Sequence, residues 1–166
     1  EKVDHASSYP QRNQLLSNRG DGTFIEVLTY DSGISNIRVS RGAAFADFDH
    51  DGDTDIAVNN SGGAAALLRN EGGNKNGWLG IELVGIGGNT NGIGASVEVY
   101  TRRHTMTRQV RAGGSYLSSH DMRLLFGLRD ADSVERITVR WSSGRMQTVE
   151  NMAANQYVKI EEKDVQ

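Results

Sequence analysis

The densest group of potential ligands in this sequence is an acidic run. It reads Asp-Phe-Asp-His-Asp-Gly-Asp-Thr-Asp from Asp47 to Asp55. Carboxylates this close together disfavour one another's ionisation unless a cation compensates them. Calcium takes about six to eight oxygen ligands in flexible geometry, whereas magnesium favours a stricter octahedron with fewer protein carboxylates. The run therefore predicts a calcium site.

The alternation within the run assigns the ligands. We expect Gly52 to allow the sharp bend, His50 to face outward and Phe48 to turn toward a core. We expect the carbonyl oxygen of Asp53 to point inward, whereas the other ligands are carboxylates. The predicted set is Asp47, Asp49, Asp51, Asp53 and Asp55.

Two alternatives to this calcium site are less favoured. An EF-hand would need Glu at loop position 12, where this sequence has Val58, and helices on both sides, where it has strand-like patterns. A solvated acidic loop without metal is the simpler alternative. We favour the metal site because the spacing matches a ligand template.

The elements that must position this loop are strands. Short runs with apolar alternation recur between Gly, Asn and Asp clusters, as in Val97 and Val99 with Glu98 between them. No helical period is sustained, and the most helix-like piece, residues 152–156, is too short to stand alone. The chain is therefore predicted to be all-β. The expected strands are residues 14–17, 23–29, 42–46, 55–59, 64–69, 78–84, 95–101, 106–111, 123–128, 133–141, 146–150 and 157–161.

Composition excludes several functional classes. The 166 residues include 20 Gly, one Pro and no Cys, so disulfide scaffolds and zinc-thiolate sites are excluded. No apolar run reaches the roughly 20 residues that cross a bilayer. The net charge of −3 at pH 7 argues against nucleic-acid binding.

The sequence divides into two parts. A Leu-Leu-x-Asn-x-Gly pattern begins at Leu15 and again at Leu67, an interval that one repeated β unit of a propeller would give. No third copy follows. We therefore predict an N-terminal repeat over residues 11–76 and a second β domain over residues 77–163.

These motifs resemble two families. Residues 43–56, preceded by the turn at residues 18–24, are similar to an FG-GAP (VCBS-type) repeat, the calcium-binding blade unit of β-propellers. The pieces at residues 92–97, 113–118, 126–128, 139–144 and 147–149 resemble the ASPIC/UnbV domain. This pairing resembles the C-terminal part of proteins related to cartilage acidic protein. In place of the family's Trp-Pro-Ser-Gly, this chain has Trp141-Ser142-Ser143-Gly144.

The resemblance implies an architecture and a function. One repeat cannot close a propeller ring, so we expect a single propeller-type blade packed on an antiparallel, sandwich or barrel-like ASPIC/UnbV domain. The implied function is non-enzymatic calcium-dependent recognition, adhesion or scaffolding by a secreted or periplasmic protein. The sequence starts without an initiator Met or a signal peptide, and we expect a mature chain or a C-terminal fragment. The resemblance itself supplies no ligand, and we expect an extracellular protein or a polysaccharide.

Two alternatives concern carbohydrate. A calcium-dependent polysaccharide hydrolase or lyase would need paired carboxyl groups in a cleft, clear of the ion. A carbohydrate-binding module would differ from the leading prediction only in its ligand. Ser118, Ser119, His120 and Asp121 are the nearest approach to a catalytic set, but neighbours on one loop rarely form a triad.

A group of arginines could hold an anionic ligand. Arg suits bidentate oxyanions, although a solvated sheet face is the simpler interpretation. The group comprises Arg102, Arg103, Arg108 and Arg111, with His104 among them.

Three further features fit ordinary structure or chance. Arg19-Gly20-Asp21 is an integrin-type tripeptide, but Gly and Asp belong to the expected turn, so we do not expect integrin binding. Asn59 begins a glycosylation sequon that chance accounts for equally well. Trp78 and Trp141 lie in strand patterns and are expected in the core rather than against a sugar.

Overall fold

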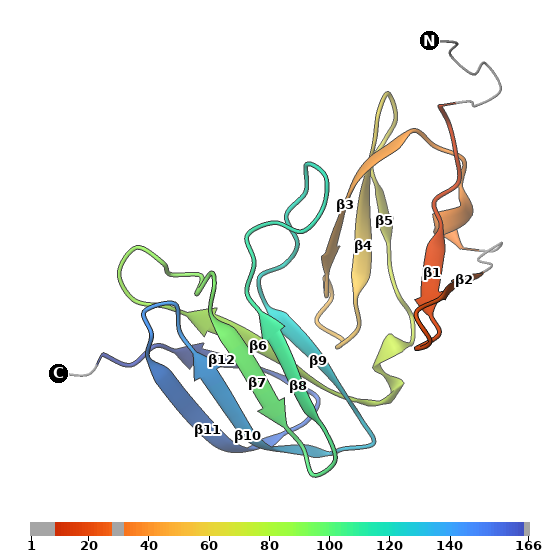
Figure 1. The fold of residues 1–166 in the computed structure, drawn as a ribbon. Helices are drawn as coiled ribbons and strands as arrows, with labels where there is room; N and C mark the ends of the chain where they lie inside the picture. The colour runs from red at the N-terminus through yellow and green to blue at the C-terminus, as the bar shows by residue number, and fades with distance from the viewer. Residues whose placement is uncertain (1–8, 28–31, 165–166) are drawn as a thin grey trace.

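The computed structural model describes residues 9–27 and 32–164, and over these residues the chain is all-β (Figure 1). It contains β-strands and two short 3₁₀ turns, η1 and η2, and no α-helix within those two ranges. None of the described helical segments has the length and apolar character that a bilayer crossing requires. The opening residues 1–5 and the predicted strand end at residues 28–29 lie outside the described residues.

The N-terminal part forms two small antiparallel sheets. One is a hairpin of β1 and β2, and the other is a three-stranded sheet in the order β3-β4-β5. A propeller blade has four strands, so the predicted blade is instead a three-stranded sheet beside a separate hairpin. The bounds are β1 Leu15–Asn18, β2 Phe24–Val27, η1 Gly33–Ser35, β3 Ser40–Ala46, β4 Asp55–Asn60 and β5 Ala66–Leu68.

The C-terminal part contains two further sheets, of four strands (β11-β10-β7-β8) and three strands (β12-β6-β9). Among the described residues no sheet closes on itself, so the barrel-like alternative is not observed. The bounds are η2 Gly73–Lys75, β6 Gly77–Val84, β7 Ser96–Tyr100, β8 Thr105–Gln109, β9 Leu124–Arg129, β10 Ser133–Arg140, β11 Met146–Ala153 and β12 Gln156–Glu161.

One strand pair corrects the antiparallel prediction. β12 runs parallel to β6, with Val158 opposite Ile81, whereas β6 and β9 are antiparallel. β12 follows β11 after a turn at Asn155, yet it joins the other sheet. Because the chain crosses between sheets there, it enters beside β6 in the same direction. Residues 152–156, the most helix-like piece of the sequence, form this turn and the strand ends that flank it.

The hydrophobic core lies between the two C-terminal sheets. The alternation in β7 and β10 is observed as predicted: Val97, Val99, Ile137 and Val139 have no exposed surface. Trp141, predicted as core, is also buried. Burying each such side chain contributes about 1.5–3 kcal/mol. The remaining buried members are Leu79, Ile81, Leu83, Ala95, Val110, Leu124, Phe126, Leu128, Val134 and Ile160.

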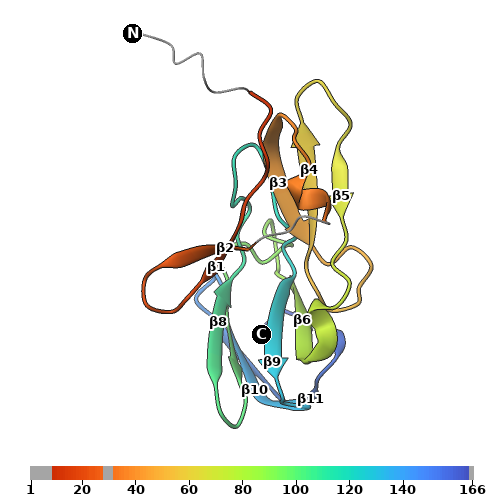
Figure 2. The same cartoon turned by 90° about the vertical axis from the view of Figure 1, so that its right-hand side faces the viewer.

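A loop from the C-terminal part reaches the N-terminal sheet. Residues 110–123, between β8 and β9, extend toward β3 in both views (Figures 1 and 2). The backbone N–H of Asp121 donates to the carbonyl of Phe45 at 2.9 Å. Gly42 lies so close to this loop that a Cβ would be 2.5 Å from the Ser118 hydroxyl. The two parts are therefore in direct contact along β3.

Candidate metal centre

The acidic loop joins β3 to β4. Asp47 follows the last residue of β3, and Asp55 is the first residue of β4. Between them the chain reverses through two residues with positive φ, His50 at 61° and Gly52 at 95°. The two strands therefore hold both ends of the loop, and this brings its first and last carboxylates together.

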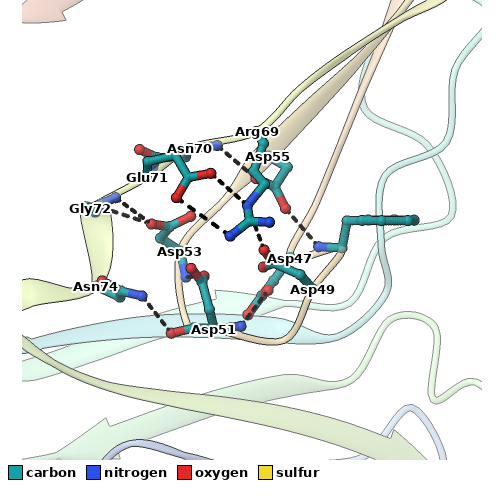
Figure 3. Close-up of polar contacts among 12 residues, drawn as sticks. Asp47, Asp49, Asp51, Asp53, Asp55, Arg69, Asn70, Glu71, Gly72 and Asn74 are labelled. Carbon is teal, nitrogen blue, oxygen red and sulfur yellow. Dashed lines mark hydrogen bonds and ion pairs between the residues drawn. The ribbon is translucent and has the colours of Figure 1, made fainter.

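Three of the five aspartates form a cluster. Asp47, Asp49 and Asp55 each place a carboxylate oxygen within 4.8 Å of the other two (Figure 3). Asp47 and Asp55 are buried. Three carboxylate oxygens at this separation could hold a metal ion.

Backbone groups hold the two buried carboxylates in place. Asp47 accepts the N–H of Asp51 on Oδ1 and that of Gly52 on Oδ2. Asp55 accepts the N–H of Phe48 on Oδ2 and that of Asn70 on Oδ1, both at 2.8 Å. An ionised carboxylate offers about four lone-pair positions, so each still has an oxygen able to meet a cation.

The other two predicted ligands lie differently. Oδ1 of Asp51 accepts the N–H of Asp53, and the backbone carbonyl of Asp51 accepts the side-chain amide of Asn74 at 2.9 Å. Asp53 is buried, and its Oδ2 accepts the N–H groups of Gly72 and Gly73 (Figure 3). The structure therefore does not bring the side chains of Asp51 and Asp53 into the cluster.

One buried oxygen of the acidic loop is left unsatisfied. Oδ1 of Asp53 has no hydrogen-bond partner among the described residues, although Asp53 is only 3% exposed. A buried carboxylate oxygen without a donor is costly. The donor set of the cluster fits a cation, and the orphaned oxygen of Asp53, although outside the cluster, needs a partner that the described residues do not supply.

A second loop contributes residues that were not predicted from the sequence. Nε of Arg69 lies 2.8 Å from Oδ2 of Asp49 and 2.9 Å from a carboxylate oxygen of Glu71. Residues 70–74 follow β5 and supply the donors to Asp51, Asp53 and Asp55 described above. The Gly and Asn residues of this segment predict only a turn. Its repeated Leu-Leu-x-Asn-x-Gly pattern was the available signal.

Phe48 and His50 both project away from the hydrophobic core. Phe48 was predicted to turn toward a core, but its side chain is 67% exposed. Its backbone N–H donates to Asp55, and this fixes the backbone with the side chain directed outward. His50 is exposed as predicted, but its ring is not free. Its Nε2 lies 2.6 Å from a guanidinium nitrogen of Arg123, and its ring centroid is 5.4 Å from that of Tyr157.

The acidic loop is also a contact between the two parts of the chain. The hydroxyl of Tyr157 donates to Oδ2 of Asp47 at 2.6 Å, and Arg123 donates to the Asp47 carbonyl at 3.1 Å. Burial, followed by the hydrogen bond to Asp47, raises the pKa of Tyr157. Trp78, half-buried rather than in the core, packs on Gly52 and against Tyr157.

The predicted arginine group is divided by the structure. Arg102 and Arg103 lie at the β7–β8 turn and pair with Glu135 at 3.8 Å and Asp130 at 2.9 Å. Arg108 and Arg111 instead line a cleft between the two parts of the chain. The four side chains therefore do not form one patch, because the hairpin separates its tip from its base.

The remaining sequence motifs have local structural roles. In the integrin-type tripeptide, Oδ1 of Asp21 accepts the backbone N–H and the hydroxyl of Thr23 within the β1–β2 turn. His120 accepts the N–H of Phe45 on Nδ1, and the Ser119 hydroxyl donates to a backbone carbonyl. Asn59 lies exposed within β4.

The structure is that of an all-β protein whose carboxylate-lined loop lies at the junction of its two parts. Sequence comparison assigns the families. Residues 2–58 match the family described as FG-GAP-like repeat, and residues 85–166 match the family described as ASPIC and UnbV. No curated protein matches the chain. The chain thus contains an FG-GAP-like repeat region followed by an ASPIC/UnbV domain, which confirms the resemblance seen in its motifs.

Proposed function

We propose that this chain is a calcium-binding, non-enzymatic recognition or scaffold module of a secreted or periplasmic protein. The observation that carries the proposal is the position of Asp47. Its carboxylate belongs to the cluster with Asp49 and Asp55, and it also accepts the hydroxyl of Tyr157 from the ASPIC/UnbV domain. An ion on this cluster would therefore stabilise both the loop and the junction.

The residues that would hold the ion are those of the cluster. Asp47 and Asp55 are fixed by backbone donors, and Asp49 carries a positive partner, Arg69, that a cation can replace. If the side chain of Asp51 rotated toward the cluster, its carboxylate and the backbone carbonyl of Asp53 would complete the five-ligand set predicted from the spacing. When bound, calcium supplies positive charge that removes the mutual repulsion of these carboxylates.

Several observations support a binding role over catalysis. The side chains of Ser119, His120 and Asp121 are engaged with backbone groups or with Arg123, and no hydrogen bond joins one of these three side chains to another. The carboxylates near the inter-domain cleft, Asp47 and Asp121, are both hydrogen-bonded. A calcium-dependent polysaccharide enzyme would need two carboxyl groups facing each other in a cleft. A polysaccharide or an extracellular protein remains our proposed class of ligand, and the secreted location follows from the family resemblance.

Thermal unfolding with and without calcium tests the metal site. At calcium a hundredfold above its dissociation constant, binding stabilises the folded state by about 2.7 kcal/mol. We expect a chelator to lower the melting temperature, and Asp49→Ala to abolish this sensitivity. Asp130→Ala, which removes an exposed carboxylate of the C-terminal part, is the matched control and keeps the response. A melting curve unchanged by chelator would overturn the proposal.

A further inference from the structure

A cleft of about 350 Å³ lies between the FG-GAP-like repeat and the ASPIC/UnbV domain. Phe45 and Thr54 line it from the repeat, and Arg108, Arg111 and Gly114 line it from the β8 strand and the loop that follows. Its volume falls within the range of small-molecule binding sites, about 300–1,000 Å³. Both domains therefore contribute to one concave surface.

The cleft has an excess of positive charge. Its two acidic residues are already engaged, since Asp121 accepts Nε of Arg123 at 2.7 Å and Asp47 is buried under its own hydrogen bonds. Arg108 and Arg111 are exposed, and neither forms an ion pair with any described residue, although the Arg108 guanidinium lies over the Phe126 ring, 5.7 Å from its centroid. Two guanidinium groups are therefore available to an anion.

The other walls suit a sugar ring. Phe45 is 39% exposed, and His120 meets its ring at 64° with a centroid distance of 4.9 Å. His120 thus supports the Phe45 ring edge-on. Thr54 adds an exposed hydroxyl. An aromatic ring, a hydroxyl and two guanidinium groups complement a saccharide that carries carboxylate or sulfate groups, because planar guanidinium binds such oxyanions bidentately.

We propose that this cleft binds an acidic saccharide, with Arg108 and Arg111 contacting its carboxylate or sulfate group. This goes beyond the calcium-binding module proposed above, because neither arginine belongs to the acidic loop. It also separates the predicted arginine group into two functions. Arg102 and Arg103 pair with Glu135 and Asp130 and take no part in the cleft.

Isothermal titration calorimetry of the full chain at constant calcium tests the proposal. The probes are a uronate-containing oligosaccharide, a sulfated oligosaccharide, a neutral oligosaccharide of equal length and inorganic sulfate. The uronate and sulfated arms distinguish the two sources of negative charge. We expect either the uronate-containing or the sulfated oligosaccharide to bind. The neutral sugar and inorganic sulfate should bind at least about tenfold more weakly.

Matched arginine variants locate the site. Arg108→Gln with Arg111→Gln should weaken binding at least about tenfold, because each charge-assisted pair is lost. Arg102→Gln with Arg103→Gln removes the same net charge outside the cleft and should change affinity less than about twofold. Equal losses in the two double variants, or no binding of either acidic probe, would overturn the proposal.

The calcium dependence separates this proposal from the preceding one. If binding of the sugar disappears in chelator and is unaffected by the Arg108 and Arg111 substitutions, the ion rather than the cleft holds the ligand, and the proposal fails. Chelator-sensitive melting would be retained in that case. Conversely, sugar binding that depends on Arg108 and Arg111 without any melting response to calcium would reject the metal site and support the cleft.

Discussion

The hydroxyl of Tyr157 donates to Oδ2 of Asp47 across 110 residues of sequence. Tyr157 lies on β12 of the ASPIC/UnbV domain, and Asp47 opens the acidic loop of the repeat. The same carboxylate belongs to the candidate metal cluster. A change in the charge around Asp47 should therefore change the strength of its hydrogen bond to Tyr157, which joins the two domains.

Arg123 strengthens this connection. Its guanidinium contacts the Asp47 carbonyl and Nε2 of His50 on the repeat, and it pairs with Asp121 on its own domain. The hydrogen bond to Asp121 raises the pKa of Arg123. The guanidinium group also lies over the Tyr157 ring, 4.9 Å from its centroid. The loop and the domain thus share a network in which each member has several partners.

Gly52 is the position where the loop is most sensitive to added volume. Its φ of 95° disfavours any side chain, and a Cβ would lie 2.0 Å from Cε2 of Trp78. Left-handed backbone costs an L-residue roughly 1–2 kcal/mol, and overpacking adds about 1–3 kcal/mol. We expect Gly52→Ala to lower the free energy of unfolding by about 2–5 kcal/mol, as measured by urea denaturation.

Gly20→Ala is the control for the backbone contribution. Gly20 has a similar φ of 82°, but no atom lies within 4 Å of its Cβ position. It should therefore show the strain of about 1–2 kcal/mol without the packing penalty. Equal destabilisation by the two substitutions would mean that the contact between the loop and Trp78 does not contribute.

Much of the fold was predictable because its signals are local. Alternation places Val97 and Val99 on one face of a strand whatever lies above them, and the turns follow from Gly, Asn and Asp. The acidic loop was equally local, since its two ends join consecutive strands. Three of the five predicted ligands, Asp47, Asp49 and Asp55, therefore converge, whereas the side chain of Asp51, also in the predicted set, is held on the N–H of Asp53.

What the sequence did not reveal depends on contacts between distant segments. The partners of Asp47 and Asp49 include Tyr157 and Arg69, and no pattern around either residue indicates this. The parallel entry of β12 beside β6 depends on a crossing between sheets. The separation of Arg103 from Arg108 required knowledge of where the hairpin tip lies.

Arg69 acts as a built-in counter-charge for the cluster. Its guanidinium neutralises Asp49, and the Arg69 side chain is 55% exposed, so solvent limits the pair to less than about 1 kcal/mol. A bound cation would have to displace or coexist with this positive charge. We expect Arg69→Gln to increase calcium affinity by about two- to fivefold, measured by titration against a competing chelator.

The control is Arg103→Gln, because Arg103 also pairs with an exposed aspartate but lies in the C-terminal part. It should leave calcium affinity unchanged. A decrease in affinity for Arg69→Gln alone would show instead that Arg69 organises the loop for the ion.

Tyr157 should make stability depend on alkaline pH. Its pKa in the folded protein is raised, by burial first and by the hydrogen bond to Asp47 second. The ordinary tyrosine pKa is about 10. Because the folded state holds this proton more tightly, the stabilisation is complete below about pH 10 and is lost as the pH rises toward the folded-state value. Tyrosine ionisation followed by ultraviolet absorbance should show a late-titrating component that Tyr157→Phe removes.

Tyr157→Phe isolates this contribution. It removes the hydroxyl but keeps the ring against Trp78 and His50. We expect a loss of about 1–2 kcal/mol at pH 8 for a half-buried hydrogen bond to a carboxylate. Other alkaline titrations affect both proteins equally, so the difference between them should shrink above about pH 10. Tyr116→Phe, at a residue that is 67% exposed, is the neutral control. If the difference in free energy of unfolding between the two proteins stays constant up to pH 11, the proton of the Tyr157 hydroxyl does not stabilise the contact between the domains.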